Sequence, residues 1–412
     1  LQGDLVHAAG DVVLVSHPGE GLALAGLDHS GVDDEAGGVV HQDLEPGPDL
    51  VHVVGSHVLF SLSCLRWSTR SCETAPVTTT RDPWPAGVWR RHLAAAVRNL
   101  DELLGMLGLD AETLGVEATA RAARRFPLRV PRGFVGRMRC GDPEDPLLRQ
   151  VLPVAVEDEE VPGFSTNPVG ELGLIRGDGL LIKYHGRALV VATGACAIHC
   201  RYCFRRHFPY DDGRAPGRRL SDALDVLADD ETIDEVILSG GDPLVLADDS
   251  LAELVDRIAS IAHVRRLRIH TRLPVVLPER VDEALVGWIT ACPIPMVVVV
   301  HANHPSEIDE DVARALGALR DAGASVLNQA VLLAGVNDSA KALADLSIRL
   351  FECGVLPYYL HLLDRVDGAA HFEVDQDRAL EIMSSLRAGL PGYLVPRLVR
   401  EAPGALSKVV VG

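Results

Sequence analysis

The sequence predicts an α/β fold, with a partial (β/α)6 barrel in its C-terminal half. From residue 188 on, short apolar runs alternate with amphipathic helical patterns, and polar clusters follow the apolar runs. Strands that alternate with helices of this length form right-handed βα units and a parallel sheet. Six such units are too few to close an eight-stranded barrel, so we expect a partial TIM-type barrel.

The expected strands are short apolar runs that end in polar or glycine-rich segments. They lie at 188–192, 235–238, 266–269, 296–300, 326–333 and 357–362. Two helical faces are expected between them, one formed by Leu251, Leu254, Ile258 and Ile261 and the other by Ile308, Val312, Leu316 and Leu319. Gly323 and Gly354 stand where C′ glycines would end helices.

The chain before the barrel divides near residue 75. Residues 1–75 are rich in Gly, Val, Asp and His and show no sustained helical period. We expect them to be an extension that is disordered or foreign to the native product. Residues 76–180 are expected to form a helical and irregular segment that precedes the barrel at 181–412. Within that segment one helix is predicted over 88–109, and a second over 111–125; the first would have Leu93, Val97, Leu100, Leu104 and Leu107 on one face.

The composition argues against several classes of protein. The 412 residues are 47% hydrophobic and carry a formal charge of −19, which disfavours non-specific binding to nucleic acid or to an anionic membrane. No run of eighteen apolar residues is present, so no transmembrane helix is expected. Eight cysteines are too few for a disulfide-stapled secreted fold. We therefore expect a cytoplasmic protein, in which a group of cysteines serves metal binding or catalysis.

Three cysteines follow the first expected strand with the spacing C-x3-C-x2-C, namely Cys196, Cys200 and Cys203. A disulfide would leave one thiol over and is disfavoured in the cytoplasm. A structural zinc site would need a fourth ligand, which His199 or His207 could supply. Three thiolates in one loop can also hold three irons of a [4Fe–4S] cluster and leave the fourth iron open to a chelating small molecule.

Polar clusters also follow the next three strands: Ser239-Gly240-Gly241-Asp242-Pro243, His270-Thr271-Arg272 and His301-Ala302-Asn303-His304. The glycines permit a tight turn, which is the simplest interpretation of the first cluster. The carboxyl ends of parallel strands are where such folds build their sites. The clusters therefore predict a functional site at this edge of the sheet.

The cysteine spacing, with an aromatic residue before the last cysteine, resembles the radical S-adenosylmethionine (SAM) superfamily. Further segments are similar, in order and spacing, to the lysine 2,3-aminomutase family, from about residue 85 to 412. They are 183–187 (KYHGR), 200–208 (CRYCFRRHF), 239–243 (SGGDP), 268–278 (RIHTRLPVVLP), 328–333 (NQAVLL), 335–338 (GVND) and 357–361 (PYYLH). The resemblance implies a radical SAM barrel with a [4Fe–4S] cluster, SAM and pyridoxal 5′-phosphate (PLP), and a C-terminal segment that carries the PLP lysine.

The resemblance also implies roles for individual residues. Of the three lysines, Lys183, Lys341 and Lys408, the last stands in the family's glycine-turn position for the PLP Schiff base. Tyr184, Arg187 and Gln329 would bind the PLP phosphate; Ser239, Gly240, Gly241 and Asp242 would contact SAM; Tyr202 and His270 would belong to the SAM or PLP shell. Arg205 would pair with the substrate carboxylate, and Asp364 and Glu401 with its distal ammonium. Arg206 and His207 receive no role.

The implied reaction converts L-lysine to β-lysine by 5′-deoxyadenosyl radical chemistry, with the migrating nitrogen held as a PLP imine. The segments 145–153 (DPLLRQVLP) and 368–372 (GAAHF), and the end of the chain four residues after Lys408, resemble the form that makes (R)-β-lysine for modification of elongation factor P. Expected partners are L-lysine, an electron donor such as flavodoxin or ferredoxin, and elongation factor P with its lysine ligase. Two alternatives stay open: a catabolic aminomutase that gives (S)-β-lysine, and a non-catalytic iron–sulfur or SAM sensor.

Overall fold

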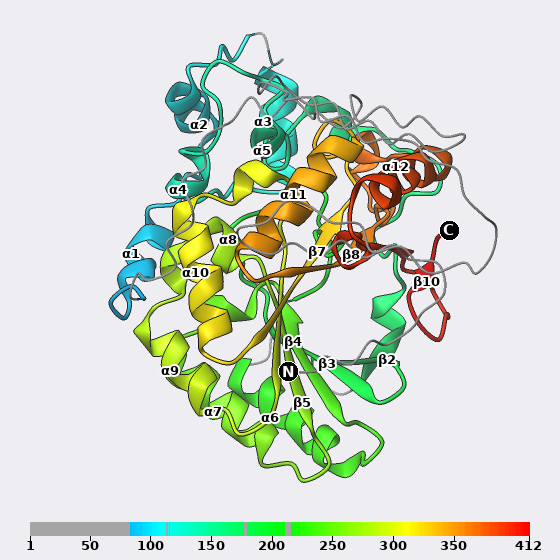
Figure 1. Cartoon of the computed structure of the whole chain (residues 1–412). Coiled ribbons are helices and arrows are strands. Elements are labelled where there is room, and N and C mark those ends of the chain that lie inside the picture. Colours follow the sequence, from blue (N-terminus) through cyan, green and yellow to red (C-terminus); the bar gives the residue numbers. More distant parts are fainter. Residues whose placement is uncertain (1–82, 113, 115, 177–178, 211–215) are drawn as a thin grey trace, which may run out of the picture. The chain divides into compact units, whose positions relative to one another are not determined.

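The computed structural model describes residues 83–412, apart from 113, 115, 177–178 and 211–215, so the extension expected at 1–75 lies outside it. Ten described strands form one sheet in the order β1 to β10. Most of these strands are labelled in Figure 1. They are β1 Ile175–Arg176, β2 Leu180–Tyr184, β3 Arg187–Thr193, β4 Glu235–Gly240, β5 Arg266–Thr271, β6 Met296–Val300, β7 Ser325–Val331, β8 Leu356–His361, β9 Arg397–Arg400 and β10 Val409–Val410. Neighbours from β3 to β9 pair in parallel, and the outer pairs are antiparallel.

The predicted partial barrel is confirmed, and the six expected strands are β3 to β8. The sequence analysis missed β9, which adds a seventh parallel strand. This strand has only two buried residues, Leu398 and Val399, between exposed arginines. The other strands were predicted from longer apolar runs, and a run of two apolar residues is too short to predict a strand.

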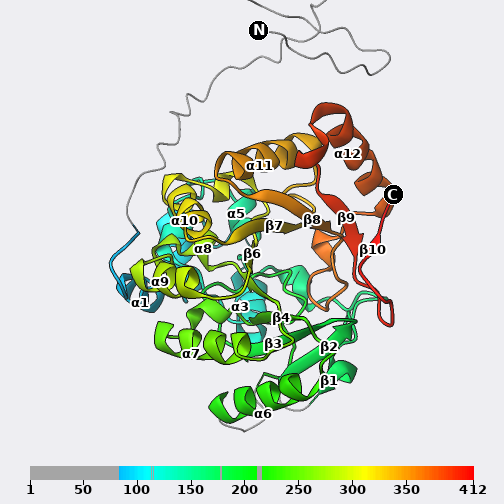
Figure 2. The ribbon, with the colours of Figure 1, turned by 60° about the horizontal axis from the view of Figure 1, so that its bottom comes forward.

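The helices that alternate with the strands lie along the outer side of the arc of strands (Figure 2). They are α6 Pro216–Asp229, α7 Asp248–Ala259, α8 Leu273–Val276, α9 Glu283–Ala291, α10 Glu310–Asp321, α11 Ala340–Glu352 and α12 Gln376–Gly389. The two expected helical faces are largely confirmed, because all their residues are buried except Ile261, which lies past the end of α7. Gly323 and Gly354 follow α10 and α11 with φ of +96° and +79°, as C′ glycines do.

Five short α-helices precede the barrel in the described residues: α1 Val88–Ala94, α2 Leu100–Leu107, α3 Val116–Arg125, α4 Arg132–Val135 and α5 Pro146–Arg149. The single helix predicted over 88–109 is wrong. Val97 instead exchanges backbone hydrogen bonds with Val130, and the Asn99 side chain caps a new helix by accepting from Asp101 N at 2.7 Å. Asparagine competes for backbone donors in this way, so an apolar period of 3.6 can run through a break between two helices.

Side chains that point alternately to the two faces of each strand separate the hydrophobic core from the interior of the arc. On β5, Leu267 and Ile269 are fully buried, whereas Arg268 and His270 line a cavity inside the arc. Successive side chains of a strand point to opposite faces, so one face of the sheet packs against the helices while the other presents polar groups. The fold thereby directs polar side chains from several strands into one space.

Candidate active site

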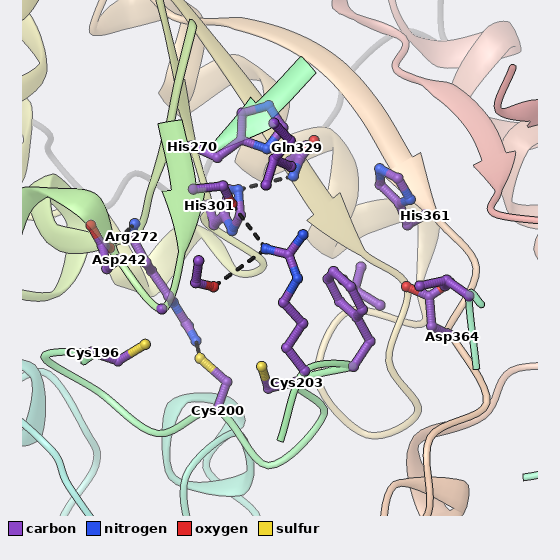
Figure 3. Close-up of a pocket in the computed structure, with 18 of the residues that line it drawn as sticks. Cys196, Cys200, Cys203, Asp242, His270, Arg272, His301, Gln329, His361 and Asp364 are labelled. Atoms are coloured by element: carbon purple, nitrogen blue, oxygen red, sulfur yellow. Dashed lines mark hydrogen bonds between the residues drawn. The ribbon is translucent and has the colours of Figure 1, made fainter. Parts of the chain in front are cut away.

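A cavity of about 400 Å³ lies inside the arc of strands. It is lined by every residue for which the sequence predicted a site role: Tyr184, Arg187, Cys196, Cys200, Tyr202, Cys203, Arg205, Ser239, Gly240, Gly241, Asp242, His270, Gln329, Asp364, Glu401 and Lys408. Figure 3 shows the three cysteines near one another, with Asp364 and His361 on a different side of the cavity. The structure therefore brings residues from distant parts of the chain into one site.

The cysteine loop is held in place by hydrogen bonds to residues outside the loop. Arg201 is completely buried and donates from Nε to Glu157 at 2.8 Å. Arg206, which had no predicted role, donates to the other oxygen of Glu157 at 2.7 Å. His207 lies 3.2 Å from the carbonyl oxygen of Asp367. These contacts fix the shape of the loop, so the arginines next to the cysteines do not form a free basic patch.

The three thiols fit the ligand set of a cluster with an open iron. All three line the cavity, and Arg272 Nη1 donates to Cys200 Sγ at 2.7 Å. Among the described residues no three or more His, Cys, Asp or Glu side chains are grouped to hold a single metal ion, whereas a [4Fe–4S] cluster spreads its thiolates over separate irons. Burial and the neighbouring thiol Cys200 raise the pKa of Cys203 to about 11, so metal binding would release protons.

The glycine turn after β4 packs against the start of the cysteine loop. A Cβ on Gly240, which has φ of +121°, would lie 2.4 Å from Thr193 O, and one on Gly241 would lie 2.3 Å from Ala195 O. Only glycine fits these positions. The turn thus places unobstructed backbone beside Cys196, where the resemblance puts SAM.

Asp242 has structural partners for its buried carboxylate. It accepts hydrogen bonds from the backbone N–H groups of Arg272 at 2.7 Å and Leu244 at 3.1 Å, and from the Thr271 hydroxyl at 2.8 Å. Burial raises its pKa to about 6 although these hydrogen bonds oppose the shift. Asp242 therefore joins the ends of β4 and β5, and any contact with SAM would come in addition to this role.

One wall of the cavity is formed by the neutral histidines His270, His301 and His361. The sequence predicted an individual role only for His270, and placed His301 in a polar cluster after a strand. His301 accepts from Gln329 Nε2 at 2.9 Å, while Nε2 of His270 and of His361 are buried without a partner in the described part of the chain. Burial lowers the pKa of His301 and His361 to about 3. Buried ring nitrogens are usually hydrogen-bonded, so these two nitrogens are exceptions at the cavity wall. Each of the three histidines lies on or directly after a strand. Their position at the ends of predicted strands could therefore have identified them from the sequence.

Glu401 joins the residues predicted to surround PLP. It accepts from Lys183 Nζ at 2.6 Å and from the Tyr184 hydroxyl at 2.5 Å, and it forms an ion pair with Lys408. Burial disfavours its charge, but Lys408 and the hydrogen bonds outweigh burial and lower the pKa of Glu401 to about 2. Arg187 stacks over the Tyr184 ring at 5.6 Å. Lys183 and Lys408 thus lie at one carboxylate, while Lys341 is exposed on α11.

Asp364 faces the same cavity with no hydrogen bond or ion pair to its carboxylate among the described residues. Burial, and then the charge of Glu401, raise its pKa to about 7. A buried acid that lacks a counter-ion can be satisfied by an incoming cation. The position suits the ammonium group of a ligand.

Arg205 is paired with a residue that the sequence analysis did not consider. Its Nε and Nη2 donate to the two carboxylate oxygens of Glu171, each at 2.8 Å. Its Nη1 donates to Ser239 Oγ at 3.0 Å. Burial disfavours the charged guanidinium, but Glu171 outweighs this and raises the pKa of Arg205. No local pattern around Glu171 marks it as a partner of Arg205.

The fold and the site define a radical SAM protein, and residues 190–346 match the sequence model described as the Radical SAM superfamily. Similarity to curated proteins narrows this class. The chain is 49% identical over 320 residues to L-lysine 2,3-aminomutase of Escherichia coli strain K12, covering 78% of this chain and 93% of that protein. It is 43% identical to the Haemophilus influenzae protein of the same name, with 78% and 95% covered, and 33% identical to that of Clostridium subterminale, with 78% and 77% covered. The chain belongs to the lysine 2,3-aminomutase family, a family of radical SAM isomerases.

A search of the described helices for membrane spans finds none of sufficient length and apolar character.

Proposed function

We propose that this protein converts L-lysine to (R)-β-lysine with a [4Fe–4S] cluster, SAM and PLP, and that the product serves the modification of elongation factor P. The observation that carries the proposal is the single cavity that holds Cys196, Cys200 and Cys203 together with Lys408 and Asp364. Radical transfer requires the radical source and the substrate to be adjacent and shielded from water, and a shared cavity brings them together.

Each cofactor has residues that fit it. The three cysteines would hold the cluster, and the Gly240–Gly241 backbone would contact SAM beside it. Lys408 would bind the PLP aldehyde, with Tyr184, Arg187 and Gln329 near the phosphate and Tyr202 or His270 in the surrounding shell. When bound, the cluster and SAM supply a carbon-centred radical, and PLP supplies a conjugated group that can delocalise an unpaired electron. An electron donor such as flavodoxin or ferredoxin would provide the reducing electron.

The residues of the chain handle protons and orientation. Glu401 stays ionised at neutral pH and pairs with Lys408, so Lys408 has to leave Glu401 before its amine can react with the PLP aldehyde. Arg205 would orient the substrate carboxylate. Asp364, with a pKa near 7, would lose its proton when the distal ammonium of lysine arrives, and Glu401 lies close enough to share that cation. The neutral histidines add no competing positive charge.

The assignment to elongation factor P is supported by two segments that pack beside the cysteine loop. Gln150, from 145–153, accepts from Arg201 N with its carbonyl oxygen at 2.9 Å. Gly368, from 368–372, accepts from Arg206 Nη1 at 3.1 Å. Both segments resemble the form that makes (R)-β-lysine, and both contact the loop that would carry the cluster. They therefore belong to the surroundings of the site.

An anaerobic assay with L-lysine, SAM, PLP and a low-potential reductant tests the proposal. The expected result is (R)-β-lysine, identified by chiral separation, and β-lysylated elongation factor P when the factor and its lysine ligase are added. Formation of (S)-β-lysine would favour a catabolic aminomutase. Absence of any isomerisation by protein with an intact cluster would favour a sensor.

A further inference from the structure

The guanidinium of Arg205 is fully engaged by other groups of the chain. Glu171 occupies its Nε and Nη2 edge at 2.8 Å on both bonds, and Ser239 Oγ and the carbonyl oxygen of Gly240 accept from Nη1 at 3.0 and 3.3 Å. A bidentate carboxylate is the preferred partner of an arginine edge. A substrate carboxylate cannot form the same two bonds until Glu171 leaves.

The segment that carries Glu171 is weakly anchored. It is a single 3-10 turn, Glu171–Leu174, and none of its four residues is buried. Leu172 is 43% exposed and Ile175, which follows the turn, is 39% exposed. Segments with little buried apolar surface open at low free-energy cost. The turn can therefore move without disrupting the core.

Gly170, which precedes this turn, lies next to the loop that leads to Lys408. Gly170 precedes Glu171 with φ of +70°, and a Cβ at that position would lie 3.5 Å from Cβ of Pro403. Pro403 begins the turn between Glu401 and Lys408. The turn that carries Glu171 and the loop that carries Lys408 are therefore neighbours in the structure.

We propose that Glu171 is an internal carboxylate that fills the carboxylate site of Arg205 in the resting protein and is exchanged for the α-carboxylate of the substrate. The proposal rests on the proposed function, which assigns Arg205 to that carboxylate. An anion pairs with the buried guanidinium both before and after the exchange, so neither of these two states leaves Arg205 as an unpaired buried charge. It also selects against diamines, because a ligand without a carboxylate has no group with which to replace Glu171.

Binding measurements on the holoprotein under anaerobic conditions, without reductant so that no turnover occurs, test the exchange. The ligands are L-lysine and 1,5-diaminopentane, which is lysine without its carboxylate. Glu171→Gln removes the internal charge and should tighten L-lysine binding about tenfold while leaving diamine binding within about twofold. Glu171→Asp, which is too short to span both nitrogens, should tighten L-lysine binding to a smaller extent. If Glu171→Gln does not fold, L-lysine binding by Glu171→Asp tests the exchange instead.

Glu373→Gln is the matched control, because it removes a glutamate that pairs with Arg365 at 2.7 Å outside the cavity. It should change neither affinity. Weaker or unchanged L-lysine binding by a folded Glu171 variant would overturn the exchange and make Glu171 a support for Arg205. Arg205→Lys tests the underlying assignment separately: loss of L-lysine binding with retained diamine binding supports the carboxylate role of Arg205 whatever the Glu171 variants show, and unchanged L-lysine binding removes the basis of both proposals.

Discussion

Arg272 donates a hydrogen bond from Nη1 to Sγ of Cys200 across 2.7 Å. Its other terminal nitrogen, Nη2, donates to Gln150 at 2.7 Å and to Glu307 at 3.0 Å, so the guanidinium is fixed beside the cysteine loop. Hydrogen bonds and positive charge at a ligand sulfur stabilise the reduced form of an iron–sulfur cluster. With Cys200 as a proposed ligand of the cluster, Arg272 would tune the cluster rather than bind it.

Replacing this arginine should lower the reduction potential. We expect Arg272→Met to shift the cluster midpoint by about 60 mV or more to the negative side, a tenfold change in a one-electron equilibrium. Arg272→Lys, which keeps the charge, should shift it less. Potentiometric titration followed by electron paramagnetic resonance measures the shift, and Arg378→Met, an exposed arginine on α12, is the control. An unchanged potential in folded Arg272→Met would show that the hydrogen bond has no influence on the cluster.

Lys408 and Lys341 form a matched pair for testing the PLP site. Lys408→Ala should reduce turnover to background and abolish the long-wavelength absorbance of bound PLP, because no other lysine is expected to bind the aldehyde. The iron content and cluster absorbance should be retained. Lys341→Ala should behave as the unmodified protein, since this side chain is 74% exposed and, within the described part of the chain, pairs only with Asp345. PLP absorbance that survives in Lys408→Ala would instead assign the cofactor to Lys183.

The glycine turn should tolerate no side chain. Gly241→Ala puts a Cβ 2.3 Å from Ala195 O and should destabilise the protein by about 1–3 kcal/mol while weakening SAM binding. Gly287→Ala, in the middle of α9 with no atom within 4 Å of the new Cβ, should be neutral or stabilising by up to about 1 kcal/mol. Thermal unfolding and equilibrium SAM binding check both expectations. Equal effects of the two changes would contradict the close approach at Gly241.

Asp364 and Glu401 should affect stability with opposite pH dependence. The pKa of Asp364 is about 7 in the folded protein and 3.8 ordinarily, so between these values the folded state binds the extra proton and stability falls as pH rises. Asp364→Asn should therefore be more stable than the unmodified protein at pH 8 and similar at pH 4. The pKa of Glu401 is about 2 in the folded protein and 4.5 ordinarily, so this residue contributes stability that is lost as pH falls through this range. Glu401→Gln should therefore be less stable than the unmodified protein at pH 7. Denaturant unfolding as a function of pH measures both, and a parallel pH dependence of the two variants would refute the assignment.

Lysine binding should release a proton at mildly acidic pH. If the distal ammonium binds at Asp364, the carboxyl group has to ionise, so affinity should rise between pH 6 and pH 8. Calorimetry in buffers of different ionisation enthalpy counts the released protons. In Asp364→Asn the release should disappear, whereas a persistent release would place the ammonium elsewhere.

The sequence by itself determined the elements that have a local or periodic signature. The six strands β3 to β8, the glycines after α10 and α11, and the placement of the cysteines after the first parallel strand all follow from patterns within short windows. Together with the resemblance, these patterns identified residues that line one cavity, because parallel βα units direct the carboxyl ends of their strands to one edge.

Only the tertiary structure decided which charged groups meet. Glu171 and Arg205 are 34 residues apart, and Tyr184 and Glu401 are 217 apart, with no period or spacing that links either pair. The same holds for Arg272 and Cys200, and for the Val97–Val130 bridge that breaks the predicted helix. The partner of a buried charge is a side chain that folding brings within hydrogen-bond distance. Because acidic and basic residues occur many times in the sequence, residue type alone cannot identify that partner.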